Sequence, residues 1–144
     1  MPSSRARVPQ HTGDDVNQRI RRRTARNVLY YSKQTDEIPR RLRELDREWD
    51  IERAIEANAA TLGFIGVMLG TFHSRRWLAV PALVTGFLLQ HTTQGWCPPV
   101  PVLRRLGFRT TFEIEVEREA LKALRGDYRR AARSGENALE AARA

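Results

Sequence analysis

One stretch of the chain is almost free of charge, and this stretch restricts the fold more than any other feature. Between Ala57 and Leu103 the only charged residues are Arg75 and Arg76. The chain of 144 residues carries 25 Lys and Arg against 17 Asp and Glu, a net charge of +8, so charged flanks enclose an uncharged insert. The averages are those of a basic soluble protein, but the patterning predicts a segment that lies in a membrane.

The uncharged insert divides into two halves of helical length. Residues 57–73 would form a helix of about 25 Å and residues 77–96 one of about 30 Å, at roughly 1.5 Å per residue. The hydrocarbon core of a bilayer is about 30 Å thick. A polar link lies between the halves, and prolines after residue 97 end the second one. We therefore predict an all-α membrane protein whose residues 57–97 form a two-span transmembrane helical hairpin.

The buried core of a soluble protein is the alternative explanation for this insert. A helix in a soluble bundle normally has a charged outer face, and neither half of the insert has one. Gly63, Gly66 and Gly70 would each weaken a soluble helix by about 1 kcal/mol relative to Ala. In a bilayer the same small residues allow helices to approach closely. Both observations favour the membrane hairpin.

The hairpin predicts which residues face one another. Folding the insert about the middle of its link brings three pairs to matching depth: Gly63 with Gly86, Gly70 with Ala79, and Asn58 with His91. The first two pairs are predicted helix-packing contacts, and the third is a predicted intramembrane polar pair. Gly66 and Gly70 also form a GxxxG motif, which fits close packing within the hairpin or contact between two chains.

Basic residues at the ends of the spans predict the orientation. Arginines gather before the first span and after the second, whereas the link has two: the outer set is Arg40, Arg41, Arg43, Arg47, Arg53, Arg104, Arg105 and Arg109. The positive-inside rule then places both termini in the cytoplasm. Trp77 and Trp96, one at each end of the second span, are predicted interface anchors. Arg104 and Arg105 are predicted to contact anionic headgroups.

The region before the hairpin is predicted to be helical and cytoplasmic. Residues 1–13 are polar and are expected to be disordered, and the region 14–56 follows. Its first helix is expected from Asp14 or Asp15 to about Lys33. A second begins near Pro39, and because nothing breaks it before Gly63, it is predicted to continue into the first span.

The region after the hairpin, 98–144, is predicted to be a second cytoplasmic helical region. Thr110 and Glu113 fit a capping box at the start of a helix, and Gly126 fits its end. Residues 112–116 alternate between apolar residues and Glu, which also suits a strand. The strong helix formers that follow favour a helix. The alternating glutamates would then spread around the helix as solvated residues.

A short signature in the second half of the insert resembles a known family. Thr85-Gly86 is followed by Gly95-Trp96-Cys97-Pro98 and then by Leu106-Gly107. This pattern, over about residues 54–107, resembles the YgaP-like transmembrane domain family. These are small bacterial inner-membrane hairpins of unassigned function, found alone or fused to a rhodanese sulfurtransferase domain. The resemblance implies a bacterial inner membrane, and it raises the question of sulfur chemistry at Cys97.

Cys97 is the one thiol, and therefore the candidate reactive group. Either it accepts sulfur or senses oxidants, with Arg104 favouring the thiolate, or it is a small apolar residue that ends a span. A single Cys excludes an internal disulfide. Prolines follow Cys97 where a rhodanese has its Arg- and Gly-bearing loop. We find no catalytic triad spacing, no phosphate-binding loop and no metal-binding motif, so no catalytic residue, metal or cofactor is predicted.

These observations predict a non-enzymatic integral inner-membrane protein of unassigned activity. Its partners would be the lipid bilayer and either a second copy of itself, as a homodimer, or another membrane protein. One alternative is a membrane-anchored thiol protein that handles sulfur or redox equivalents through Cys97. A second is a soluble basic helical protein that binds nucleic acid through Arg21, Arg22 and Arg23. Interspersed acidic residues and the apolar insert disfavour nucleic acid as a partner.

Overall fold

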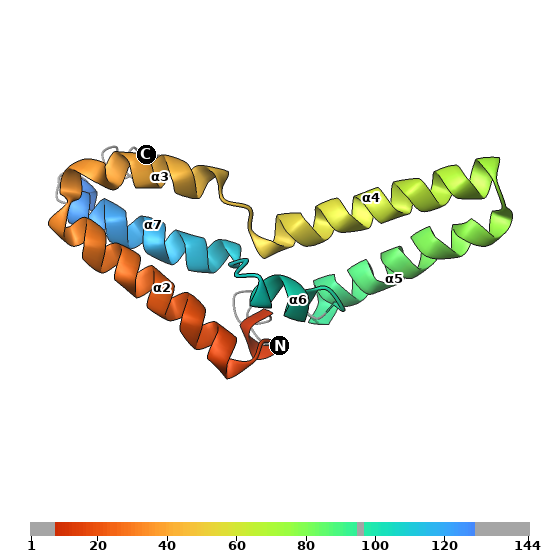
Figure 1. The fold of residues 1–144 in the computed structure, drawn as a ribbon, viewed down its shortest axis with the longest axis horizontal. Helices are drawn as coiled ribbons and strands as arrows, with labels where there is room; N and C mark the ends of the chain where they lie inside the picture. Colours follow the sequence, from red (N-terminus) through yellow and green to blue (C-terminus); the bar gives the residue numbers. More distant parts are fainter. Residues whose placement is uncertain (1–7, 95–96, 129–144) are drawn as a thin grey trace. The chain divides into compact units, whose positions relative to one another are not determined.

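Every element in the described part of the chain is helical, which confirms the all-α prediction (Figure 1). The computed structural model describes residues 8–94 and 97–128. The elements, with η for a 3-10 helix, are α2 (Asp14–Lys33), η1 (Thr35–Glu37), α3 (Ile38–Arg47), α4 (Ile51–Phe72), η2 (Arg75–Leu78), α5 (Ala79–Gln94), α6 (Val100–Arg105) and α7 (Thr111–Arg125). The residues that also suited a strand, 112–116, lie in α7.

The helices belong to two units that differ from the predicted regions. The first unit contains residues up to Gln18 together with 49–111, and the second contains 19–48 and the residues from 112 onward. The hairpin is therefore not a separate region bounded at 57 and 97. Its base includes α6 and the start of the described chain, because these segments share one apolar core with α4.

In the first unit, α4 and α5 run antiparallel, side by side, and η2 joins them at the far end (Figure 1). Their common core lies at the opposite end of the hairpin. It consists of buried residues from α4, from α6 and from the segments before them: Val8, Ile51, Ala54, Ile55, Cys97, Val100 and Leu103. This core fixes the base of the hairpin, while most of its length projects beyond it.

The prediction of a continuous helix from Pro39 into the first span is wrong. The helix ends at Arg47, and Glu48 is extended, with φ −66° and ψ 128°. Asp50 then caps α4, because its side chain accepts a hydrogen bond of 2.7 Å from the Arg53 N–H. The Ile51 N–H donates to the Arg109 carbonyl at 2.9 Å. A long-range backbone contact and a side-chain cap therefore begin a new helix.

The prediction that residues 1–13 are disordered is wrong for 8–13; residues 1–7 lie outside the described residues. Val8 and Thr12 are buried, and the Thr12 hydroxyl donates to the Val8 carbonyl at 2.8 Å. The Asn17 amide donates to the carbonyls of Pro9 and Thr12. These hydrogen bonds satisfy the backbone of a short turn that sequence composition alone described as polar and irregular.

The second unit has an apolar core to which three helices contribute. The core cluster joins the end of α2 to α3 and α7: Tyr31, Ile38, Leu42, Leu45, Ile114 and Leu121. The α3 residues follow the i, i+4, i+7 spacing of a single helix face. As predicted, α7 begins directly after Thr110 and ends before Gly126, whose φ of +88° suits glycine.

Candidate functional site

The α4–α5 hairpin is held together at two glycines of α4. A Cβ added at Gly66 would lie 2.6 Å from Pro81 Cδ and 3.0 Å from Val80 Cβ. One added at Gly70 would lie 2.5 Å from Leu78 Cδ2. The GxxxG motif therefore forms notches that receive larger side chains of η2 and α5, and its two glycines are committed to packing within one chain.

The other predicted packing residues do not lie at this contact. A Cβ at Gly63 or at Gly86 would meet nothing within 4 Å, and Ala79 is exposed. The predicted pairing of small residues with small residues is therefore wrong for Gly63, Gly86 and Ala79. The contacts of Gly66 and Gly70 lie one to three residues from the positions that the predicted register places opposite them, and larger side chains fill the space there instead of small ones.

The predicted polar pair is also not formed. The Asn58 amide donates to the Ala54 carbonyl of its own helix at 3.0 Å, and it makes no hydrogen bond to His91 in the described structure. Threonines on both helices bond in the same way, Thr61 to the Ala57 carbonyl at 2.7 Å and Thr85 to the Pro81 carbonyl at 2.7 Å. Such local bonds satisfy polar groups without a partner from the other helix.

The outward surface of the hairpin is apolar. Phe64 is 67% exposed and Phe72 is 79% exposed, and Leu83 on α5 is 64% exposed. Within the described residues, one stretch, Thr35–Phe72, which contains η1, α3 and α4, has a window long and apolar enough to cross a membrane, and 17% of that window is buried. The core helix of a soluble protein passes the same test but is mostly buried. α5, with 16 residues, falls short of the length, so the second span stays a prediction.

Cys97 lines an apolar cavity at the base of the hairpin. The cavity has a volume of about 170 Å³ and lies between α4, α5 and the Cys97–Pro99 turn. The thiol is buried, at 5% exposure, and burial raises its pKa. A raised pKa lowers the fraction of thiolate at neutral pH, so the surroundings of Cys97 favour the unreactive thiol.

The predicted interface anchors have different surroundings. Trp77 lies in η2 and is 42% exposed, and Arg105 is exposed on α6, so both are accessible. Trp96 lies outside the described residues. Arg104 is 1% exposed, so the prediction that it contacts headgroups is wrong.

Arg104 instead forms hydrogen bonds to three segments of the first unit. Its guanidinium donates to Asn17 Oδ1 at 2.8 Å, to Thr12 Oγ1 at 3.2 Å and to the Phe108 carbonyl at 3.2 Å. Oxygens from α2, from the preceding turn and from the chain after α6 thus share one buried cation. Each donor–acceptor pair is remote in sequence or involves the backbone, so no motif indicated it.

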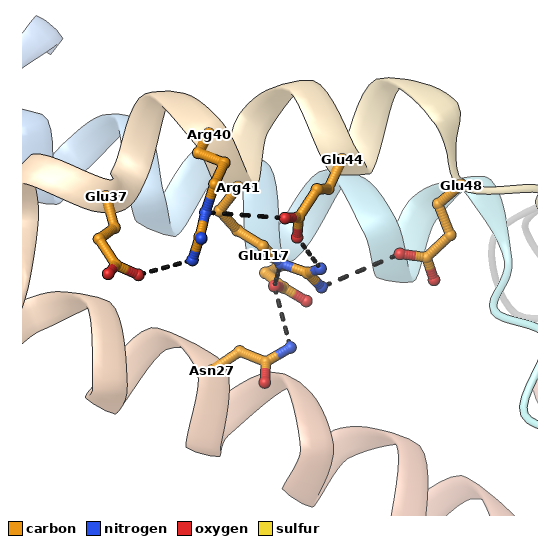
Figure 2. Close-up of polar contacts among 7 residues, drawn as sticks. All are labelled: Asn27, Glu37, Arg40, Arg41, Glu44, Glu48 and Glu117. Atoms are coloured by element: carbon orange, nitrogen blue, oxygen red, sulfur yellow. Dashed lines mark hydrogen bonds and ion pairs between the residues drawn. The ribbon is translucent and has the colours of Figure 1, made fainter.

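A buried ion pair in the second unit is a further polar feature that the residue patterns did not predict (Figure 2). The prediction that the glutamates of α7 are solvated is wrong for Glu117. Glu117 is fully buried, and its Oε1 accepts from Arg41 Nε at 2.9 Å and from Asn27 Nδ2 at 3.1 Å. Figure 2 shows how side chains from α2, α3 and α7 converge on this carboxylate. The sequence contained a signal for the burial of Glu117. This residue follows Ile114 by three residues and precedes Leu121 by four, so it lies on the apolar stripe of α7.

Further carboxylates surround Arg41. Its Nη1 donates to Glu44 Oε2 at 3.1 Å, and its Nη2 lies 3.9 Å from Glu48 Oε2. Burial disfavours the charged guanidinium, but the hydrogen bonds to Glu117 and Glu44 outweigh that effect and raise the Arg41 pKa. The arrangement joins helices electrostatically. The described residues hold no group of three or more His, Cys, Asp or Glu able to bind a metal ion.

Comparison with protein families, with curated proteins and with solved structures found no match to the chain. The resemblance to the YgaP-like transmembrane family therefore rests on the sequence pattern alone.

Proposed function

We propose that the chain is a small integral inner-membrane protein without enzymatic activity. Two spans, about 57–73 and 77–96, cross the bilayer as a hairpin, and both termini lie in the cytoplasm. The second unit remains in water, where it associates with a second copy or with a membrane protein partner.

One observation carries this proposal: the apolar side chains of α4 point outward. A soluble helix hides its apolar stripe, whereas only 17% of the apolar window that ends in α4 is buried. The side chains concerned are large, as the exposures of Phe64 and Phe72 illustrate. An apolar surface of this kind is stable only when another apolar phase covers it, and a bilayer covers both helices of a hairpin at once.

The dimensions of the helices agree with two spans. α4 has 22 residues, or about 33 Å at roughly 1.5 Å per residue, so it contains nearly the whole of the first span and extends beyond it at the base. The η2–α5 segment runs for about 32 Å when its first four residues rise about 2.0 Å each. The hydrocarbon core of a bilayer measures about 30 Å. The helical backbone of α4 and of the η2–α5 segment also satisfies the peptide groups that lipid cannot hydrogen-bond.

The charges support the orientation. Most of the arginines that precede the first span in the sequence are exposed, and so is Arg105 after the second: the preceding set is Arg40, Arg43, Arg47 and Arg53. Juxtamembrane cations of this kind favour the cytoplasmic side, where the leaflet is anionic. The YgaP-like signature around Cys97 agrees with an inner-membrane location. The raised pKa of the buried Cys97 thiol speaks against the alternative of a sulfur-handling protein.

Alkaline carbonate extraction of bacterial membranes tests the proposal. The wild-type chain should stay in the membrane pellet. Met68 is 41% exposed within α4, and Met68→Arg should release a large share of the chain, because an arginine inside a bilayer costs about 3 kcal/mol. Met68→Leu is the matched control and should remain in the pellet. Recovery of the wild type in the supernatant, or equal extraction of both variants, contradicts the proposal.

A reporter enzyme that is active only in the periplasm tests the orientation separately. Fused after Ala144, it should be silent, and fused within the link at Ser74, it should be active. The opposite result would reverse the topology without removing the hairpin from the membrane.

A further inference from the structure

The cavity at the base of the hairpin has the character of a small apolar binding site. Among the described residues that line it, none is charged. Its walls come from α4, through Ile55, Ala59 and Leu62, and from α5, through Val84 and Phe87. The Asn58 side chain also reaches the wall, but its amide is bonded to the Ala54 carbonyl. A water molecule needs two to four polar partners, so this lining does not favour water.

The volume of the cavity sets the size of its occupant. At about 170 Å³ it is close to an engineered cavity of about 150 Å³, lined by Leu, Ile and Phe, that remains dry and takes up benzene. The space therefore suits an uncharged group of about six carbon atoms. It is also partly open, so a longer molecule can enter with one segment and leave the remainder outside.

The surroundings of the cavity indicate which kind of apolar molecule occupies it. Leu62, on its wall, is itself 49% exposed, and the outward side of α4 beyond it is apolar. The cavity is thus continuous with the surface that the proposed function assigns to lipid. Acyl chains are the apolar groups present there at the highest concentration, and a flexible chain end can fill a partly open cavity without a charged contact.

We propose that this cavity binds a segment of one phospholipid acyl chain, which acts as a structural lipid between α4 and α5. The inference rests on the proposed membrane location. The site would recognise the acyl chain of the lipid and not its headgroup, because the described lining has no charged residue to bind a headgroup. The bound segment would replace the missing van der Waals contacts at the base of the hairpin.

Filling the cavity from within tests the proposal. Ala59 lines the cavity and Ala60 is exposed beside it, so Ala59→Phe and Ala60→Phe form a matched pair. The full chain is purified in a mild detergent, palmitoyl-oleoyl phosphatidylcholine is added, and the retained lipid is counted by native mass spectrometry. The wild type and Ala60→Phe should retain one lipid. Ala59→Phe should bind it about tenfold more weakly or worse, because excluding even two methylene groups costs that much.

Further arms keep the test decisive. Val84→Phe fills the cavity from the other helix, with the exposed Leu83→Phe as its control, and circular dichroism verifies that each variant is folded. Exchanging phosphatidylcholine for phosphatidylglycerol should leave the difference between the variants unchanged. Equal retention by all folded variants would overturn the proposal, and so would a difference that appears with one headgroup only.

Cys97 provides a second readout in the unaltered protein. Because the Cys97 thiol lines the cavity, a bound acyl chain should slow the reaction of this thiol with a maleimide. The comparison is between lipid-depleted protein before and after lipid is added. Ala59→Phe should remove this response. A wild-type labelling rate that does not depend on lipid would contradict acyl-chain binding. Carbonate extraction separates the two proposals: a chain that stays in the pellet but retains no lipid disproves the cavity inference alone.

Discussion

The hairpin and the second unit use the same secondary structure but distribute large and small residues differently around their helices. α3 buries Ile38, Leu42 and Leu45 and exposes arginines, whereas α4 buries Gly66 and Gly70 and exposes Phe64. In the second unit the large apolar residues form the core, and most charged residues lie at the surface. The hairpin buries Ile51 and Ile55 at its base, but beyond the base its small residues are inside and its large apolar ones face outward. Helix content therefore does not distinguish the two regions, whereas the distribution of residue size and charge around each helix does.

The two regions also differ in how their helices are joined. The second unit combines an apolar cluster with the buried Arg41–Glu117 ion pair. Beyond its base the hairpin depends on side chains of η2 and α5 that pack against the α4 glycines, and its threonines bond within their own helices. Four predictions test this difference, from the largest expected effect to the smallest.

Removing the buried carboxylate should damage the second unit most. Glu117→Ala leaves the Arg41 guanidinium without its buried partner, and the free energy of unfolding should fall by about 3–5 kcal/mol. Glu115→Ala removes an exposed partner of Arg118 and should cost less than about 1 kcal/mol. Urea unfolding followed by circular dichroism measures both. Equal losses would show that the buried pair contributes no more than a surface pair.

Filling a glycine notch should loosen the hairpin. Gly66→Leu forces a side chain against Pro81 and Val80, and overpacking of this kind costs about 1–3 kcal/mol. Gly63→Leu enters open space and should change the packing little. Protease resistance of the chain in detergent distinguishes the variants. Greater sensitivity of Gly63→Leu than of Gly66→Leu would restore the pairing first expected from the sequence.

Straining the end of α7 should have a smaller effect. Gly126 has a φ of +88°, and a Cβ added there would meet open space, so Gly126→Ala introduces backbone strain without a clash. The free energy of unfolding should fall by about 1–2 kcal/mol. Thermal unfolding in parallel with wild type measures the change. An unaltered midpoint would show that α7 ends without the left-handed residue.

The smallest effect is a dependence on pH at the base of the hairpin. Burial raises the Glu52 pKa, although hydrogen bonds, including one from the Thr111 N–H, oppose the shift. The folded chain therefore binds this proton more tightly than the unfolded chain does. Glu52 contributes stability below its unfolded pKa, and that contribution is lost as pH rises through the raised folded pKa.

Glu52→Gln should remove this dependence, so that it gains stability relative to wild type as the pH rises from about 4 to about 7, the range above the ordinary carboxyl pKa. Urea midpoints at several pH values measure the difference. Glu56→Gln, with an exposed side chain in the same helix, is the control. Parallel pH profiles for wild type and Glu52→Gln would disagree with a raised folded pKa.

Much of the fold was predictable from residue patterns that act over one or two turns. The start of α2 at Asp14 and the end of α7 before Gly126 lie where the sequence predicts them, and so does the end of α4 before the polar link. These signals are local, because a cap or a stop depends on side chains within about four residues of it. The candidate site was predicted less well: Gly66 and Gly70 lie at the contact, but Gly63, Gly86 and Ala79 do not.

The sequence by itself determined that the described chain is helical and that one stretch is apolar and almost free of charge. Tertiary structure decided which charges are buried. Arg104 and its acceptor Asn17 are 87 residues apart, and Arg41 and Glu117 are 76 apart. Whether a charge is buried depends on whether remote partners offset its loss of hydration, and a pattern along one helix does not contain that information. The hairpin register was decided in the same way, by which side chains of the opposite helix fit the space above each glycine.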